Sequence, residues 1–140
     1  FPILIIFSSP AIDEIIFLAL GGLTYLVGLF IEIIADYQKT IHNKLNNKKR
    51  KFISNGLWSR SRHPNYFGEF LIWTGITIIC FPVFSGFKYL ALITPIFIYF
   101  LLNYISGVNL LEERAKERWG NNPEYVKYLK TTPKFFPKIF

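Results

Sequence analysis

Three long apolar runs, separated by polar segments, dominate the pattern of hydrophobic and polar residues along the chain. The first run, Ile15–Ala35, would be about 31 Å long as an α-helix, which is enough to cross the hydrocarbon core of a bilayer. The third run contains Pro95, which predicts a kink that neighbouring helices must accommodate. We therefore expect three transmembrane helices, over residues 15–36, 67–84 and 88–106.

Shorter segments precede and follow these runs. The apolar stretch at the N-terminus is interrupted by Pro10, so we interpret 1–14 as the remnant of a preceding helix and its loop. After the third run, Asn109–Trp119 is a charged helix candidate, and a second short helix is expected over Glu124–Lys130. The predicted fold is a single all-α domain, 1–140: a polytopic transmembrane helical bundle whose tail, 109–140, lies at the membrane surface and caps the basic face.

Composition supports an integral membrane protein. The chain is 51% hydrophobic and 19% aromatic, with a mean hydropathy of +0.31, which is too apolar for an ordinary soluble domain. Its single cysteine, Cys80, lies within a predicted span and has no partner for an internal disulfide. Two histidines without nearby thiols are poor grounds for a zinc site, so we predict no metal.

The net charge of +7 is concentrated at one side of the predicted membrane. Eight basic residues and no acidic ones lie between Asp36 and Glu69, and a further basic group lies in the tail. By the positive-inside tendency, both segments face the cytoplasm, or the matrix or stroma of an organelle. Asn43–Lys51, rich in Asn and Lys, is expected to be a mobile surface loop. Because the charge flanks membrane spans, we predict contacts with anionic lipid or an anionic cofactor and not with nucleic acid.

The densest polar cluster is SRHPNYFGE, Ser61–Glu69, directly before the second apolar run. Pro64 suits the first turn of a helix and Asn65 could cap it. Glu69 would then lie a turn inside the hydrocarbon boundary, where an ionisable group is costly unless it is paired or faces a wet cavity. This favours a functional site. The alternative is a helix cap with Arg62 and His63 anchored among lipid head groups.

A second polar face lies on the first predicted span. Its members step by four, three, four and four residues: Gly21, Tyr25, Gly28, Glu32 and Asp36. The glycines permit close helix packing, and the two carboxylates could join the cluster around Glu69. Alternatively, these carboxylates pair with Lys39 or Arg62 as topology anchors. In the tail, the charged residues of 112–118 suit a solvated helix face, and Tyr125 and Tyr128 suit packing.

The motifs GLWSRSRHPNYFGE and SGVNLLEERAKERWGNNPEYVKYLKTTPKFFP together resemble the DUF1295 group within the steroid 5-alpha-reductase C-terminal family. The resemblance runs from about Ile31 to Pro137. It implies a polytopic helical membrane protein that uses NADPH to saturate a carbon–carbon double bond in a hydrophobic lipid or steroid-like substrate. An apolar pocket would suit a sterol, a fatty enoyl chain or a prenyl lipid equally well.

The same resemblance implies the candidate cofactor site. Asn65, Gly68 and Glu69 match a pattern around the nicotinamide and ribose, and Asp36 matches an acidic contact, whereas Glu32 stands where steroid reductases usually carry Asn. Arg62 and His63, with Lys39 or Arg114, would meet phosphate oxygens, and Tyr125 the adenosine side. The cofactor-binding candidates are Glu32, Asp36, Arg62, His63, Asn65, Tyr66, Glu69, Arg114 and Tyr125. No catalytic residue is assigned, because in the reductases those groups come from N-terminal helices that this chain does not contain.

Two alternatives remain open. The architecture also resembles isoprenylcysteine carboxyl methyltransferases, in which an RHP-type motif and a later Glu pair bind S-adenosylmethionine, and RHPNY with Glu112 and Glu113 fits that pattern. We prefer the reductase because Asn65, Glu69 and the NPEYVKYLKTTPKFFP ending fit DUF1295 better. The third hypothesis is a non-catalytic subunit of a larger membrane assembly, in which partner helices stabilise a small bundle.

Overall fold

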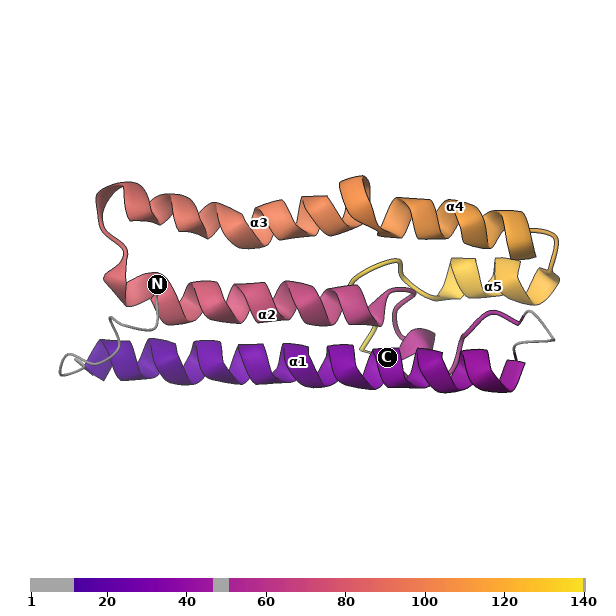
Figure 1. The fold of residues 1–140 in the computed structure, drawn as a ribbon, viewed down its shortest axis with the longest axis horizontal. Coiled ribbons are helices and arrows are strands. Elements are labelled where there is room, and N and C mark those ends of the chain that lie inside the picture. The colour runs from indigo at the N-terminus through magenta and orange to yellow at the C-terminus, as the bar shows by residue number, and fades with distance from the viewer. Residues whose placement is uncertain (1–11, 47–50, 140) are drawn as a thin grey trace.

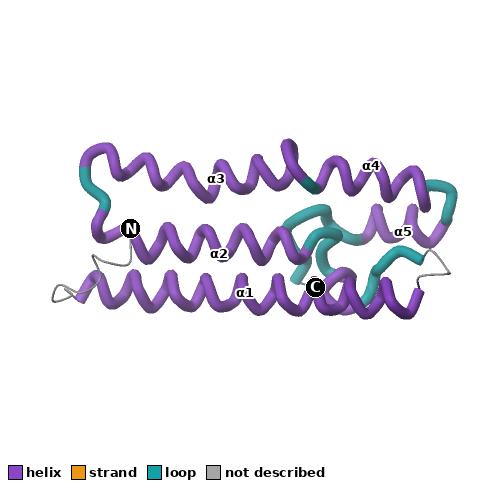
Figure 2. Tube along the Cα trace, in the orientation of Figure 1, coloured by secondary structure: helices purple, strands orange, loops and turns teal. Residues whose placement is uncertain are grey.

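Helices make up all the regular secondary structure of residues 12–46 and 51–139, which a computed structural model of the protein describes (Figures 1 and 2). The α-helices are α1 (Ile12–Asn46), α2 (Pro64–Cys80), α3 (Ile93–Phe100), α4 (Val108–Trp119) and α5 (Pro123–Thr131). Short 3-10 helices span Gly56–Ser59, Phe81–Val83 and Gly86–Leu92, and a π-helix spans Leu101–Ser106. The predicted all-α fold is confirmed.

The long helices lie side by side in a row, with α2 between α1 and α3 (Figure 1). Three helical segments are long and apolar enough to cross a membrane, which confirms the three predicted spans: Ile12–Asn46, Pro64–Val83 and Gly86–Trp119. At 35 residues, α1 is about 52 Å long and exceeds the thickness of a bilayer's hydrocarbon core. Its polar C-terminal part, from Asp36 onward, lies at the same end of the bundle as α4 and α5 (Figure 1). We call this end the head; it comprises Asp36–Asn46, residues 51–63, α4, α5 and the tail to Ile139.

Glycines bring α1 and α2 into backbone contact. A Cβ atom added to Gly21 would lie 2.6 Å from the carbonyl oxygen of Gly75, and one added to Gly28 would lie 2.6 Å from that of Gly68. The two glycines on each helix are seven residues apart, so they recur on one face after two turns. Ala35, seven residues beyond Gly28, is fully buried. The close packing predicted for the glycines of the first span is therefore present.

The first helix extends beyond the predicted span at both ends. Residues 12–14, expected in a loop before the helix, form its first turn, and the rest of the predicted remnant lies outside the described residues. At the other end α1 continues to Asn46, so the first part of the predicted Asn43–Lys51 loop is helical, while 47–50 lie outside the described residues. No Gly or Pro interrupts 29–46, and Asn46 Nδ2 donates to the His42 carbonyl oxygen at 3.0 Å. Polarity alone does not end a helix that lacks a breaker.

The start and end of α2 follow its prolines. Pro64 occupies the first helical position as predicted, but His63 is the N-cap residue and Asn65 lies inside the first turn. The expectation that Asn65 caps the helix was therefore wrong by two positions. Pro82 cannot donate a backbone hydrogen bond, and the chain changes to a 3-10 turn at Phe81.

The third span changes helix type along its length. A 3-10 helix runs to Leu92, and α3 begins at Ile93, so the predicted kink at Pro95 falls in the first turn of α3, where a proline is tolerated. The π-helix follows, and Gly107 separates it from α4. The two predicted tail helices are confirmed as α4 and α5, each within one residue at both ends.

Candidate functional site

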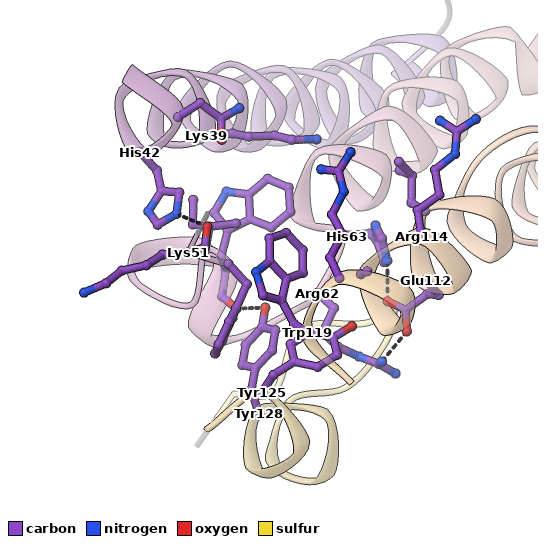
Figure 3. A pocket seen from close by; sticks show the side chains of 17 residues that line it. Lys39, His42, Lys51, Arg62, His63, Glu112, Arg114, Trp119, Tyr125 and Tyr128 are labelled. Carbon is purple, nitrogen blue, oxygen red and sulfur yellow. Dashed lines mark hydrogen bonds and ion pairs between the residues drawn. The ribbon is translucent and has the colours of Figure 1, made fainter. Parts of the chain in front are cut away.

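A cleft of about 380 Å³ opens in the head between the end of α1, α4 and α5 (Figure 3). Basic and aromatic side chains dominate its walls. The basic residues are Lys39, Lys51, Arg62, Arg114 and Arg118, and Glu112 is the one acidic residue that lines it. The aromatic residues are Phe52, Trp58, Trp119, Tyr125 and Tyr128. The cleft therefore combines positive charge with flat apolar surfaces.

Trp58 forms a fixed wall of this cleft. Its side chain is 4% exposed, and its Nε1–H donates to the carbonyl oxygen of Ala35 at 3.1 Å. The Tyr128 hydroxyl donates to the carbonyl oxygen of Trp58 at 2.6 Å, which ties α5 to the 3-10 turn. The Lys39 ammonium lies 5.4 Å from the centroid of the indole ring, a cation–π distance. Trp58 is thus held from α1 and α5 at once.

The remaining aromatic side chains pack around Phe52. Ring centroids lie 5.1 Å from Phe52 to Tyr125, 5.4 Å to Tyr128 and 6.1 Å to Trp119. Burial raises the pKa of both Tyr125 and Tyr128, so both phenols stay protonated at neutral pH. Tyr125 is 3% exposed, and its main contribution to the cleft is packing area.

Glu112 binds two residues of the RHP motif. One carboxylate oxygen pairs with Arg62 Nη1, and the other lies 2.7 Å from His63 Nε2. Burial lowers the pKa of His63 despite the neighbouring carboxylate, so the ring is neutral at pH 7 and donates its Nε2–H to Glu112. Arg62 Nε is also buried, and has no hydrogen-bond partner among the described residues. One guanidinium donor in the lining of the cleft is therefore unused.

The C-terminal tail holds this motif in place. The Arg62 backbone N–H donates to the Pro133 carbonyl oxygen at 2.9 Å, and the Ser61 hydroxyl donates to the Phe135 carbonyl oxygen at 2.7 Å. The Lys138 N–H donates to the carbonyl oxygen of Arg60 at 2.9 Å. Residues 60–62 are thus paired with a segment more than seventy positions later, which fixes where Arg62 and His63 point.

The predicted carboxylates lie beside the cleft, and none of them lines it. Glu32 faces Gly68 across the helix contact, because a Cβ added to Gly68 would lie 3.0 Å from the Glu32 Cβ. Glu32 is within electrostatic range of Asp36 and Glu69. None of the three carboxylates has an ion-pair partner within the described ranges, and Arg62 pairs with Glu112 instead. We call Glu32, Asp36 and Glu69 the acidic cluster.

Tyr66 and Asn65 lie between the cleft and the acidic cluster. The Tyr66 ring stacks on His63 with a centroid distance of 6.0 Å, and it is within electrostatic range of Glu69 and Asp36. Its hydroxyl occupies the space beside Gly107, where an added Cβ would lie 2.8 Å away. Asn65 Oδ1 is buried without a hydrogen-bond partner in the described part of the chain.

The nine predicted site residues therefore fall into two adjoining groups. Four line the cleft, and these are Arg62, His63, Arg114 and Tyr125. The other five are Glu32, Asp36, Asn65, Tyr66 and Glu69, which lie deeper along α1 and α2. Sequence reasoning missed Trp58 and Trp119 as walls of the cleft. The available signal was the position of Trp58, four residues before Arg62 of the RHP motif. The described residues contain no group of three His, Cys, Asp or Glu side chains that could hold a metal ion.

Comparison with protein families gives one match. A family model described as "Protein of unknown function (DUF1295)" matches residues 1–132, nearly the whole chain. No curated protein and no solved structure matches the chain. The matched region includes the RHP motif, both glycine pairs and all nine predicted site residues. The chain belongs to the DUF1295 family.

Proposed function

We propose that this protein is a membrane-bound reductase that binds NADPH in the cleft and reduces a carbon–carbon double bond of a hydrophobic lipid or steroid-like substrate. One observation carries the proposal. Five Lys and Arg side chains and five aromatic rings line a cleft that contains a single acidic residue. A dinucleotide presents phosphates, which suit guanidinium and ammonium groups, and flat rings, which suit aromatic faces.

The residues present fit such a cofactor. Arg114 and Arg118 lie one turn apart on α4 and have no ion-pair partner among the described residues, so both are available for phosphate oxygens. Figure 3 shows Lys39 and Arg114 on different sides of the cleft, Lys39 from α1 and Arg114 from α4. The volume of 380 Å³ lies in the lower part of the usual range for small-molecule sites, about 300–1,000 Å³.

NADPH, when bound, supplies a hydride to one alkene carbon while a proton goes to the other. The contribution of this chain is to bind the cofactor, to orient it and to shield the reacting atoms from water. Trp58 is held rigidly enough to fix the plane of a ring that stacks on it. The acidic cluster lies on the membrane side of the cleft, the side from which an apolar substrate would come. This position supports a site at which a water-soluble cofactor and a lipid meet.

S-adenosylmethionine-dependent methyl transfer to a lipid or prenylcysteine is the second candidate. It is favoured by the Arg62–Glu112–His63 cluster, since an RHP motif with a later Glu is the pattern of those enzymes. The charge of the cleft opposes it. A sulfonium cation gains nothing from a cleft with five basic residues and one acid, whereas phosphates do.

Direct binding measurements distinguish the two. The purified protein in lipid nanodiscs is titrated by calorimetry with NADPH and, separately, with S-adenosylmethionine. We expect saturable NADPH binding, and the double variant Arg114→Gln/Arg118→Gln should weaken it about a hundredfold or more, because two charged hydrogen bonds are lost and each is worth roughly 1.5–3 kcal/mol. Lys44→Gln is the matched control, because Lys44 is exposed on α1 and does not line the cleft.

Selective binding of S-adenosylmethionine would refute the reductase proposal and favour a methyltransferase. Binding of neither molecule would favour the third hypothesis, a non-catalytic subunit of a larger membrane assembly.

A further inference from the structure

An apolar groove of about 540 Å³ lies at the end of the bundle opposite the head, where α2 connects to α3 (Figure 1). Its main lining residues come from two facing elements. These are Trp73, Thr77 and Cys80 of α2, and Lys88, Ala91 and Thr94 of the segment that leads into and begins α3. The groove is separate from the cleft and shares no residue with it.

Helix periodicity explains why these residues form one concave surface. Side chains three apart on a 3-10 helix lie above one another, which places Lys88 and Ala91 in line with Thr94 at the start of α3. Ala91 has the smallest side chain and Trp73 the largest of the residues that line the groove. Thr77 Oγ1 donates to the Trp73 carbonyl oxygen at 2.9 Å, so its polar atom is already paired and the interior of the groove stays apolar.

The length of the groove matches one leaflet. From Trp73 to Cys80, α2 rises about 10 Å, at 1.5 Å per residue. The 3-10 turn Phe81–Val83 adds about 6 Å. The sum, about 16 Å, is close to half of a hydrocarbon core about 30 Å thick. A groove of this depth accommodates an extended acyl chain from the membrane surface to the bilayer midplane.

The positive charge of Lys88, at one end of the groove, would select a lipid with an anionic head group. Lys88 is exposed and is the sole Lys or Arg among the described residues at this end, where α1 begins with Asp13 and Glu14. Lys88 has no ion-pair partner among the described residues. A lysine at this depth lays its aliphatic stem along the apolar surface and keeps its ammonium at head-group level.

We propose that this groove is a binding site for an anionic phospholipid of the leaflet opposite the head. One acyl chain lies in the groove between Trp73 and Ala91, and the head-group phosphate contacts the Lys88 ammonium. The site does not depend on the reductase proposal, because it lies at the other end of the spans. It gives this end of the protein, which has few charges, a specific lipid contact.

Trp73 makes the proposal measurable. The chain has three tryptophans, and the other two, Trp58 and Trp119, line the cleft in the head, at the opposite end of the bundle from the groove. Bromine atoms on an acyl chain quench tryptophan fluorescence on contact. The protein is reconstituted in phosphatidylcholine bilayers, and chain-brominated phosphatidylglycerol is compared with chain-brominated phosphatidylcholine at equal mole fraction. We expect phosphatidylglycerol to be preferred about fivefold, the effect of one lysine near an anionic surface.

Two variants test the two halves of the site. Lys88→Gln should lower the ratio of quenching by phosphatidylglycerol to quenching by phosphatidylcholine to one. The matched control Lys44→Gln, on the head side, should leave this ratio unchanged. Ala91→Phe should fill the groove and reduce quenching by both lipids, with folding checked by circular dichroism. Equal quenching by both lipids in the unaltered protein, or a preference that survives Lys88→Gln, would overturn the proposal. Quenching by neither lipid would also overturn it, because another helix or a second copy would then cover the groove.

Discussion

Replacing Glu112 by glutamine tests whether the Arg62–Glu112–His63 cluster holds the head together. The side chains of Arg62 and Glu112 are 15% and 13% exposed, so solvent does little to compensate a lost charge. Glutamine keeps one acceptor oxygen, which can serve one of the two donors, and turns an amide group toward the other. One hydrogen bond is lost, and the other no longer has a charged acceptor.

The magnitude follows from these two losses. A hydrogen bond to a charged group contributes about 1.5–3 kcal/mol, and removing one partner of a fully buried ion pair costs about 3–5 kcal/mol. Because this pair is partly exposed, we expect Glu112→Gln to lower the free energy of unfolding by about 2–3 kcal/mol. Glu113→Gln is the matched control, since Glu113 is exposed and has no ion-pair partner among the described residues.

The assay is equilibrium unfolding in mixed micelles, followed by tryptophan fluorescence, because Trp58 and Trp119 lie beside the cluster. A double-mutant cycle with Arg62→Gln isolates the pair. The double variant should lose less stability than the sum of the single variants by about 1 kcal/mol or more, since it leaves no unpaired cation. Equal stability of the Glu112→Gln and Glu113→Gln variants, or strict additivity in the cycle, would refute this reasoning.

Three further predictions use matched pairs or a pH series. Gly28→Ala should destabilise by about 1–3 kcal/mol because its Cβ meets Gly68 backbone, whereas Gly22→Ala, with open space around it, should be neutral or stabilising in the same unfolding assay. Tyr128→Phe leaves the Trp58 carbonyl without its donor and should cost about 1–2 kcal/mol, while Tyr125→Phe, which removes no hydrogen bond among the described residues, should cost less. The folded pKa of His63 lies below 6.5, so the unfolded chain binds more protons and stability relative to a His63→Gln variant should fall as pH drops below 6.5; a parallel pH dependence of the two proteins would contradict this.

Hydropathy was sufficient to predict the three spans, because an apolar run long enough to cross a bilayer rarely forms anything other than a transmembrane helix. It was insufficient for the end of α1, since Asp36–Asn46 is polar and a polar helix in the head carries no hydropathy signal. Helix breakers were the better guide there: α1 continues through a stretch without Gly or Pro, and α2 begins at one proline and ends before another. The prediction that Asn65 caps α2 was wrong for a local reason: Pro64 already occupies the first helical position, so the N-cap residue is His63.

For the site, the sequence indicated which segments meet and four of the side chains that line the cleft, but not its two tryptophan walls. Periodicity placed Glu32 and Asp36 on the face that packs against α2, and this face lies beside the cleft. The position of Trp58 before the RHP motif was an ambiguous signal, since a tryptophan next to a span is as typical of the membrane interface as of a binding site. Its role depends on hydrogen bonds to Ala35 and Tyr128, which only the folded tail brings together.

The level at which the cleft sits has a kinetic consequence. Arg62 and His63 immediately precede α2, which begins the second candidate span, so two lining residues of the cleft lie at the end of a span. Under the proposed function, the concentration of the cofactor is an amount per volume of water, whereas that of the lipid substrate is an amount per area of membrane. Turnover should then follow the mole fraction of substrate in the bilayer, and adding inert lipid should slow the enzyme although every aqueous concentration is unchanged. The products separate in the same way, because the spent cofactor diffuses away in three dimensions and the reduced lipid in two.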